Sequence, residues 1–260
     1  MKKKTIFVLT MVLSSLVGVS FACADYDDTV SAHWACDSIA GGMAADSSGN
    51  GNDGLLTDVT LVEGVFGSAY SFNGTSSYID MGDPADNDLD FWVHDFSILF
   101  WIKTSWTQGF SSIIEKDVAN LRLQIQVTPE GKLRVIVGTT APITEGNIDI
   151  CDGEWNHVAV IRKDGVVTSI VNGLLDANGT ASGSTSNDEH FYIGTQGGNS
   201  FFADIDLDDI LTLKTRALGE TEITAIMTDS VAGFYGMIPE PGSIIYVIVS
   251  ACIVLRKRFF

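Results

Sequence analysis

The sequence predicts an all-β protein whose strands form a sandwich or a barrel. Short runs of alternating apolar and polar residues recur along the chain, as in FSILFWIKT (96–104) and WNHVAVIRK (155–163). Gly, Asn, Asp and Ser separate these runs, and β-branched and aromatic residues are frequent within them, which is typical of strands joined by turns. Only the segment 220–228 has a helical pattern, of about two turns.

The predicted elements form one domain, from about residue 25 to about residue 236. The clearest strand patterns cover residues 69–73, 77–82, 96–104, 121–128, 132–139, 155–163 and 166–172. Turn residues at 129–131 (PEG) and 163–165 (KDG) join neighbouring runs as hairpins. The larger apolar side chains on these strands are expected to pack between two sheets, namely Trp34, Phe72, Phe100 or Trp101, Trp155 and Leu211.

The N-terminal segment is typical of a secretory signal peptide. Three lysines at 2–4 precede an apolar stretch at 6–19, and Ala22-Cys23-Ala24 supplies small residues for cleavage before Asp25. A lipoprotein with an acylated Cys23 is the alternative, but Ser20-Phe21-Ala22 does not suit it. Residues 1–24 are therefore expected to be removed by signal peptidase during export.

The charge of the chain excludes one class of partner. The 33 acidic and 15 basic residues give a net charge of −18, and loss of the three leader lysines makes it −21. A body this acidic repels phosphate backbones and anionic lipid surfaces, so nucleic acid is not an expected partner. A surface this acidic is better suited to binding divalent cations.

Two cysteines remain in the predicted domain. Cys36 and Cys151 could form a disulfide in an exported protein, which would stabilise the fold by about 4 to 5 kcal/mol. Two free thiols are the equally weighted alternative. No Cys-x-x-Cys or Cys/His cluster occurs in the sequence, so zinc is not predicted.

Seven segments, taken in order, resemble the laminin-G-like, concanavalin A-like jelly-roll domains. They are His33-Trp34 with Asp37, DSSGNGNDG (46–54), GSAYSFNGTSSYIDMGD (67–83), FSILFWIKT (96–104), DGEWNHVAVIRKDG (152–165), Asn172-Gly173 and LDDILTLKTRALGETEI (207–223). The resemblance implies a two-sheet antiparallel jelly roll. Cys36 and Ala203-Asp204 depart from the family pattern, which affects the closing edge rather than the fold.

The same resemblance implies a structural calcium ion that joins the 46–54 loop to the closing strand. Its expected ligands are Asp46, Ser48, Asn50, Asp208 and Asp209, because calcium prefers carboxylate, amide and carbonyl oxygens. The alternative is a turn rich in Asp and Asn without a metal, since these residues favour turns for reasons of their own.

Two further groups of residues are candidates for function. Trp92 and Trp106 flank the 96–104 strand in loop-like surroundings, where an indole can stack on a sugar ring. Asp204, Asp206 and Asp208 alternate on one strand and resemble the E-x-D-x-E strand of jelly-roll glucanases. All three are Asp where those enzymes use Glu at the outer positions, so hydrolysis is the minority hypothesis.

The C-terminal segment 237–260 resembles the PEP-CTERM sorting signal of Gram-negative bacteria. It contains Pro239-Glu240-Pro241, an apolar run at 244–255 and the basic triplet Arg256-Lys257-Arg258. The apolar run would span only about 18 Å as a helix, against a hydrocarbon core of about 30 Å. The resemblance implies transient insertion in the inner membrane, cleavage by an exosortase, and delivery to the cell envelope, cell surface or extracellular matrix.

The sequence therefore predicts an exported, non-catalytic binding or structural protein. Its expected partners are an extracellular polysaccharide or a surface glycoconjugate. A glycoside hydrolase that uses Asp204, Asp206 and Asp208 is the alternative.

Overall fold

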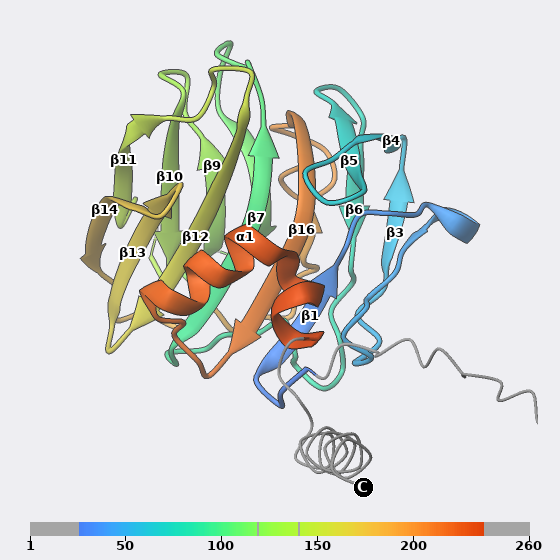
Figure 1. The fold of residues 1–260 in the computed structure, drawn as a ribbon. Helices are drawn as coiled ribbons and strands as arrows, with labels where there is room; N and C mark the ends of the chain where they lie inside the picture. Colours follow the sequence, from blue (N-terminus) through green and yellow to red (C-terminus); the bar gives the residue numbers. More distant parts are fainter. Residues whose placement is uncertain (1–25, 119, 140, 237–260) are drawn as a thin grey trace, which may run out of the picture.

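The computed structural model describes residues 26–118, 120–139 and 141–236. Two antiparallel β-sheets pack face to face and a single helix covers the outside of one of them (Figure 1). This confirms the predicted two-sheet jelly roll. The predicted signal peptide (1–24) and the predicted sorting segment (237–260, with Pro239, Glu240, Pro241, Arg256, Lys257 and Arg258) lie outside the described residues.

The first sheet carries the helix and most of the long strands. Its order is β14 (Leu174–Thr180), β13 (Val166–Val171), β12 (Trp155–Lys163), β7 (Phe96–Lys103), β16 (Asp204–Lys214), β5 (Ser68–Asn73) and β4 (Thr60–Glu63). β1 (Val30–Trp34) also pairs with β16, over Ile210–Leu213, while β5 pairs with Asp204–Leu207. β16 therefore holds together the two halves of this sheet.

The second sheet lies behind the first in Figure 1. Its order is β11 (Thr144–Asp149), β10 (Lys132–Val137), β9 (Leu123–Val127), β8 (Ser111–Lys116), β15 (Tyr192–Ile193), β6 (Tyr78–Asp80), β3 (Gly54–Thr57) and β2 (Met43–Ala44). A short 3-10 helix, Ala40–Gly42, precedes β2.

The predicted hairpins form because their turn residues accept the left-handed conformation. Asn172 and Gly173, between β13 and β14, both have positive φ (52° and 75°), as the tight turns that match strand twist require. Asp164 and Gly165 do the same between β12 and β13 (50° and 77°). These turns fix the register of three consecutive strands.

The apolar side chains form two separate cores. The central core lies between the sheets and includes Trp34, Phe72 and Phe100, as predicted. A second core lies between the first sheet and the helix, and Leu211 belongs to it, so its predicted place between the sheets is wrong. Trp155 is only partly buried and lies in neither core, because the alternation of β12 directs it, like His157, to the outer face.

The helix α1 (Glu220–Gly236) is longer than the predicted helix at 220–228 and crosses the outer face of the first sheet (Figure 1). Ser230 interrupts it with φ 67°. The chain continues beyond this kink because Val231 and Tyr235 are buried in the second core. The ring of Tyr235 also lies 5.0 Å from that of Tyr26, so the two ends of the described domain meet at one corner.

Cys36 and Cys151 are free thiols, so the disulfide alternative is wrong for this structure. The Cys36 thiol is buried and donates to Trp34 O (3.3 Å), whereas the half-buried Cys151 thiol donates to Trp106 O (3.1 Å). Burial raises the pKa of Cys151 to about 11, which keeps this thiol protonated and unreactive.

Candidate functional site

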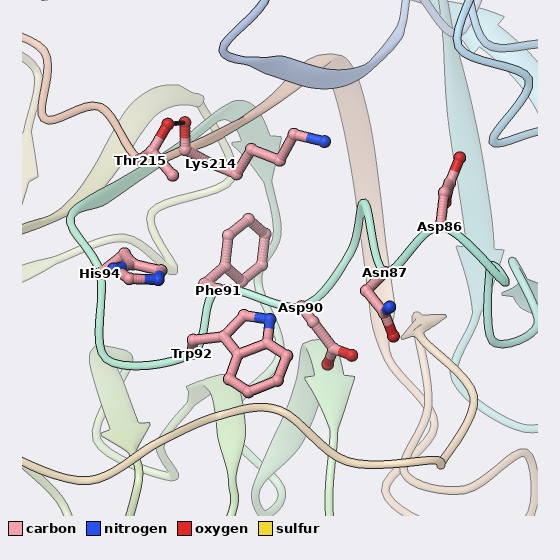
Figure 2. Close-up of a pocket in the computed structure, with 8 residues that line it drawn as sticks. All are labelled: Asp86, Asn87, Asp90, Phe91, Trp92, His94, Lys214 and Thr215. Atoms are coloured by element: carbon pink, nitrogen blue, oxygen red, sulfur yellow. Dashed lines mark hydrogen bonds between the residues drawn. The ribbon is translucent and has the colours of Figure 1, made fainter.

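A hollow of about 260 Å³ lies at one end of the sandwich, where the β6–β7 loop meets the end of β16. Figure 2 shows the residues that line it, which are Asp86, Asn87, Asp90, Phe91, Trp92, His94, Lys214 and Thr215. They combine one large aromatic surface with acidic, amide, imidazole and amine groups. This combination is typical of a site that binds a polar ligand with an apolar face.

Trp92 is the most unusual residue of this hollow. Its side chain is 48% exposed and its backbone has φ 51°, a conformation that bulky residues rarely adopt. The Trp92 carbonyl accepts hydrogen bonds from Thr185 N (3.1 Å) and from Arg162 Nη1 (3.2 Å). Strained backbone of this kind tends to occur at functional sites, and here it presents an indole to solvent.

The buried Arg162 side chain holds the loop that carries Trp92 in place. Its guanidinium also donates to Gly183 O (3.0 Å) and Ala181 O (2.8 Å), so one side chain fixes two loops. Burial lowers the pKa of Arg162 below its usual value. The charge is retained because a guanidinium has an intrinsic pKa above 12.

Lysines hold two acidic residues of the β6–β7 loop, Asp90 in the lining of the hollow and Asp88 two residues before it. Lys214 pairs with Asp88, and the buried Lys116 lies 3.2 Å from Asp90 and 2.6 Å from Asp83. The two lysine amines thus hold Asp88 and Asp90 in fixed positions.

A second hollow of about 420 Å³ adjoins the first and shares His94 and Thr215 with it. Its other lining residues are Val93, Asp95, Asp164 and Gly165. The two hollows thus meet at His94 and Thr215 at this end of the sandwich.

Trp106, the other predicted ligand-binding tryptophan, is not part of this surface. It follows the C-terminal end of β7, whereas Trp92 precedes the N-terminal end, so the two lie at opposite ends of the sandwich. The Trp106 indole donates to Gly109 O (3.1 Å) and its carbonyl accepts from the Cys151 thiol. Its contacts fold the β7–β8 loop.

The predicted calcium loop is arranged as a turn that satisfies its own polar groups. Asp46 Oδ1 accepts from His33 N (3.0 Å), Ser48 N (2.9 Å) and Ser48 Oγ (2.7 Å), and its Oδ2 accepts from Asn52 N (3.1 Å). Asn50 Nδ2 donates to Val30 O (2.7 Å). The Asp46 carboxylate is thus directed at hydrogen-bond donors.

The other two predicted calcium ligands, Asp208 and Asp209, have hydrogen-bond partners outside this loop. Asp208 Oδ2 accepts from Val65 N (2.8 Å) and Phe66 N (2.9 Å), while Asp209 bonds to His33 Nε2 and Val231 N. Within residues 26–118, 120–139 and 141–236, no three His, Cys, Asp or Glu side chains form a group that could hold a metal ion. This arrangement does not fit an ion that bridges the loop to β16.

The alternative catalytic residues share a face of β16 but differ in environment. Ile205 and Leu207 point into the central core, so Asp204, Asp206 and Asp208 point outward. Asp204 is exposed, Asp206 is half-buried and Asp208 is fully buried. Burial raises the pKa of Asp208 to about 6. With Oδ2 held by two backbone N–H groups, Asp208 is a poor nucleophile.

Glu115 is a buried carboxyl group that no pattern in the sequence predicted. It is 3% exposed on the outer face of the second sheet, where Gln124 Nε2 (3.3 Å) and Ser112 Oγ (3.4 Å) donate to its Oε2. Burial, with a smaller contribution from Asp117, raises its pKa to about 8. No spacing motif contains Glu115, and only the folded sheet shows its burial.

The two packed sheets define the class of protein as a concanavalin A-like jelly roll. Residues 73–224 match the Laminin_G_3 family, described as the concanavalin A-like lectin/glucanases superfamily. The chain therefore belongs to this family, as its resemblance predicted. The superfamily includes both glycoside hydrolases and non-catalytic binding domains.

Solved structures of similar fold include domain 4 of AbnA, a GH43 extracellular arabinanase from Geobacillus stearothermophilus, in complex with arabinotriose. It has a TM-score of 0.57 and 22% identity, over 76% of this chain and 98% of that one. The binding domain of Paraclostridial Mosquitocidal Protein 1 has a TM-score of 0.61 and 19% identity, over 78% and 52%. Trypanosoma rangeli sialidase in complex with sialic acid has a TM-score of 0.62 and 16% identity, over 80% and 34%.

The present chain thus spans about half of the second of these chains and about a third of the sialidase. At these identities the likeness concerns the fold alone. No curated protein matches the sequence.

Proposed function

We propose that this protein is a non-catalytic saccharide-binding jelly roll and that the Trp92 hollow is its binding site. The observation that carries the proposal is the exposed Trp92 indole, held in a left-handed conformation by the buried Arg162. A sugar ring presents an apolar face that stacks on an indole. Its hydroxyl groups can donate to Asp90 and accept from Lys214 or His94.

The fold neighbours are consistent with this class of ligand. One of them is a domain described in complex with arabinotriose, and another is a sialidase described in complex with sialic acid. The two aspartates and single lysine of the hollow favour a neutral saccharide, because an acidic one would be repelled. An extracellular polysaccharide or a surface glycoconjugate is the partner that we propose.

Binding is better supported than hydrolysis. Retaining hydrolysis needs an acid and a nucleophile about 5 to 5.5 Å apart. Asp88 and Asp90 are paired with lysines, and Asp208 is bonded to backbone N–H groups. A sugar-release assay on polysaccharides checks this point, and release that is lost in Asp206→Asn would replace the binding proposal with the hydrolase alternative.

Isothermal titration with neutral oligosaccharides, beginning with arabinotriose, tests the binding site. We expect Trp92→Ala to weaken binding about fivefold or more, because an aromatic stack is worth about 1 kcal/mol or more. Phe201→Ala is the matched control, since Phe201 is also an exposed aromatic residue (47%) with positive φ (48°), on another loop. Equal binding by wild type and Trp92→Ala would remove this site from the proposal, and a glycan array without any bound saccharide would overturn the function.

We also propose export and sorting to the cell envelope, with processing by signal peptidase and an exosortase. The proposal rests on the leader pattern at 1–24 and on the Pro-Glu-Pro, apolar and basic pattern at 237–260. Among the described residues, no helix is both long and apolar enough to cross a membrane. The intact mass of the mature protein tests the proposal: a chain that ends near Glu240 supports it, and one that retains Phe260 contradicts it.

A further inference from the structure

The second hollow extends the Trp92 hollow in one direction. The two hollows share His94 and Thr215 as lining residues. In Figure 2 these two residues lie on one side of the Trp92 indole, and Asp86 and Asn87 lie on the other. A ligand that continues from Trp92 past His94 therefore enters the second hollow.

The side chains that line the second hollow can be reached from solvent. Val93 is 54% exposed, and His94, Asp164 and Thr215 are exposed as well. They supply an apolar surface, an imidazole, a carboxylate and a hydroxyl, which suit the apolar face and the hydroxyl groups of a sugar ring. Among the described residues, the Asp164 carboxylate has no hydrogen-bond or ion-pair partner, so both of its oxygens are available to a ligand.

Asp164 is held in a fixed position relative to Trp92. It follows Arg162 by two residues, and Arg162 Nη1 donates to the Trp92 carbonyl (3.2 Å). The backbone N–H of Asp164 donates to Asp95 Oδ1 (2.8 Å), which ties the β12–β13 turn to the β6–β7 loop. The two hollows are thus arranged before a ligand arrives, which reduces the cost of ordering them on binding.

The volumes of the hollows limit the length of the ligand that each can hold. Small-molecule sites are typically clefts of about 300 to 1,000 Å³. The Trp92 hollow, at about 260 Å³, falls just below this range, and the second hollow, at about 420 Å³, falls within it. The Trp92 hollow alone therefore suits a ligand of about one ring, and a longer chain needs the second hollow as well.

We propose that the two hollows bind consecutive units of one neutral oligosaccharide, with Trp92 stacked on the first ring and Asp164 accepting hydrogen bonds from hydroxyl groups of the next. A carboxylate with two free oxygens can accept from two neighbouring hydroxyls. In the described part of the chain, the second hollow is lined by Asp95 and Asp164 but by no lysine or arginine, so an acidic unit would be repelled there. This inference rests on the proposed saccharide binding and adds the length of the ligand and a specificity-determining residue.

The dependence of affinity on chain length tests the proposal. Isothermal titration with arabinose, arabinobiose and arabinotriose measures it, with the corresponding series from cellulose and from maltose in parallel. We expect affinity to rise roughly tenfold from the monosaccharide to the longer ligands, which is what a hydrogen bond to a charged group contributes.

Asp164→Gly should abolish most of this gain. Glycine removes the carboxylate but accepts the left-handed backbone of Asp164 (φ 50°), and we expect the gain to fall from roughly tenfold to about twofold or less. Asp164→Asn, which suits the same turn and retains one acceptor oxygen, should give an intermediate gain. Asp58→Gly is the matched control, because Asp58 is exposed, has φ 50° and lines neither hollow; it should keep the full gain.

Asn87→Gly tests the opposite direction of the ligand. Asn87 also has positive φ (60°) but lies on the far side of Trp92 from the second hollow. We expect this substitution to change the affinities for short and long ligands by the same factor. Loss of the gain in Asn87→Gly, with the gain kept in Asp164→Gly, would mean that the ligand extends the other way and would overturn the proposal.

The outcomes separate this inference from the proposed function. Binding that depends on Trp92 but has equal affinity for all chain lengths overturns the second subsite and keeps the proposed function. An equal gain in wild type and Asp164→Gly also overturns the role of the second hollow. Absence of binding to every saccharide on a glycan array overturns the inference and the proposed function together.

Discussion

His33 Nε2 lies 2.7 Å from Asp209 Oδ1 in a buried pair that joins β1 to β16. The second oxygen of Asp209 accepts from Val231 N of α1 (2.7 Å), and the Tyr26 hydroxyl lies 2.5 Å from His33 Nδ1. One carboxylate thus connects two strands and the helix. Asp209 has φ 51° at the irregularity of β16, so the bulge is what brings the carboxylate to both partners.

Asp209→Ala should destabilise the fold by roughly 3 kcal/mol, because it leaves His33 Nε2 and Val231 N without partners in a buried place. The free energy of unfolding in urea measures the loss. Asp229→Ala is the control, since Asp229 is exposed on the same helix. A loss as small as that of the control would show that the pair does not stabilise the fold.

Arg162→Lys should weaken saccharide binding and stability together. Lysine keeps the charge but not the planar fork that reaches Trp92 O, Gly183 O and Ala181 O. We expect a stability loss of about 2 kcal/mol and a clear fall in affinity for a neutral oligosaccharide. Arg134→Lys on β10 is the control, and affinity equal to that of the wild type would refute the supporting role of Arg162.

The raised pKa of Glu115 leads us to expect that the protein becomes less stable as pH rises. A salt-bridged carboxylate would have the opposite effect. Its pKa rises from the usual 4.5 to about 8 on folding. Between these values only the folded state holds the proton, so the free energy of unfolding falls as pH rises. Each pKa unit corresponds to about 1.4 kcal/mol, so the total is at most about 5 kcal/mol.

Glu115→Gln should remove this dependence and make the variant more stable than wild type at pH 8.5 but not at pH 4. Urea unfolding at several pH values measures it. Glu130→Gln, in the exposed β9–β10 turn, is the control. If the two variants show parallel pH profiles, the Glu115 carboxyl is not protonated in the folded protein.

Calcium provides a further prediction, because the sequence and the structure lead to different expectations. With the Asp46 carboxylate directed at four hydrogen-bond donors, we expect Tm to be the same in EDTA and in excess calcium. A bound ion would instead raise Tm with its concentration. An increase that is lost in Asp46→Asn would restore the calcium site that the family resemblance implies.

The strands with clear alternation could be predicted from the sequence, and β12 begins and ends at the predicted residues. β8 (SSIIEK) was missed because all six residues are buried and a register shift after Ser112 breaks its alternation. β11 and β14 are polar or Gly-containing strands at the ends of their sheets. Their formation depends on pairing with neighbours rather than on local preference.

The candidate site could be predicted only in part. Trp92 was visible as an aromatic residue in loop-like sequence, but its support comes from Arg162, 70 residues away. The lysines that hold Asp88 and Asp90 come from β16 and β8. No local spacing records these long-range contacts.

The contact between Tyr26 and Tyr235 shows that the described part of the chain begins and ends at the same corner of the domain. Lys214 N donates to Thr29 O, and Arg216 pairs with Asp27, so the Trp92 hollow lies at the same end as both exits of the chain. Asp208 is six residues back along β16, about 20 Å away on a strand. Any attachment made through the preceding or following segments would therefore hold the Trp92 hollow close to the supporting surface and place the Trp106 end of the sandwich away from it.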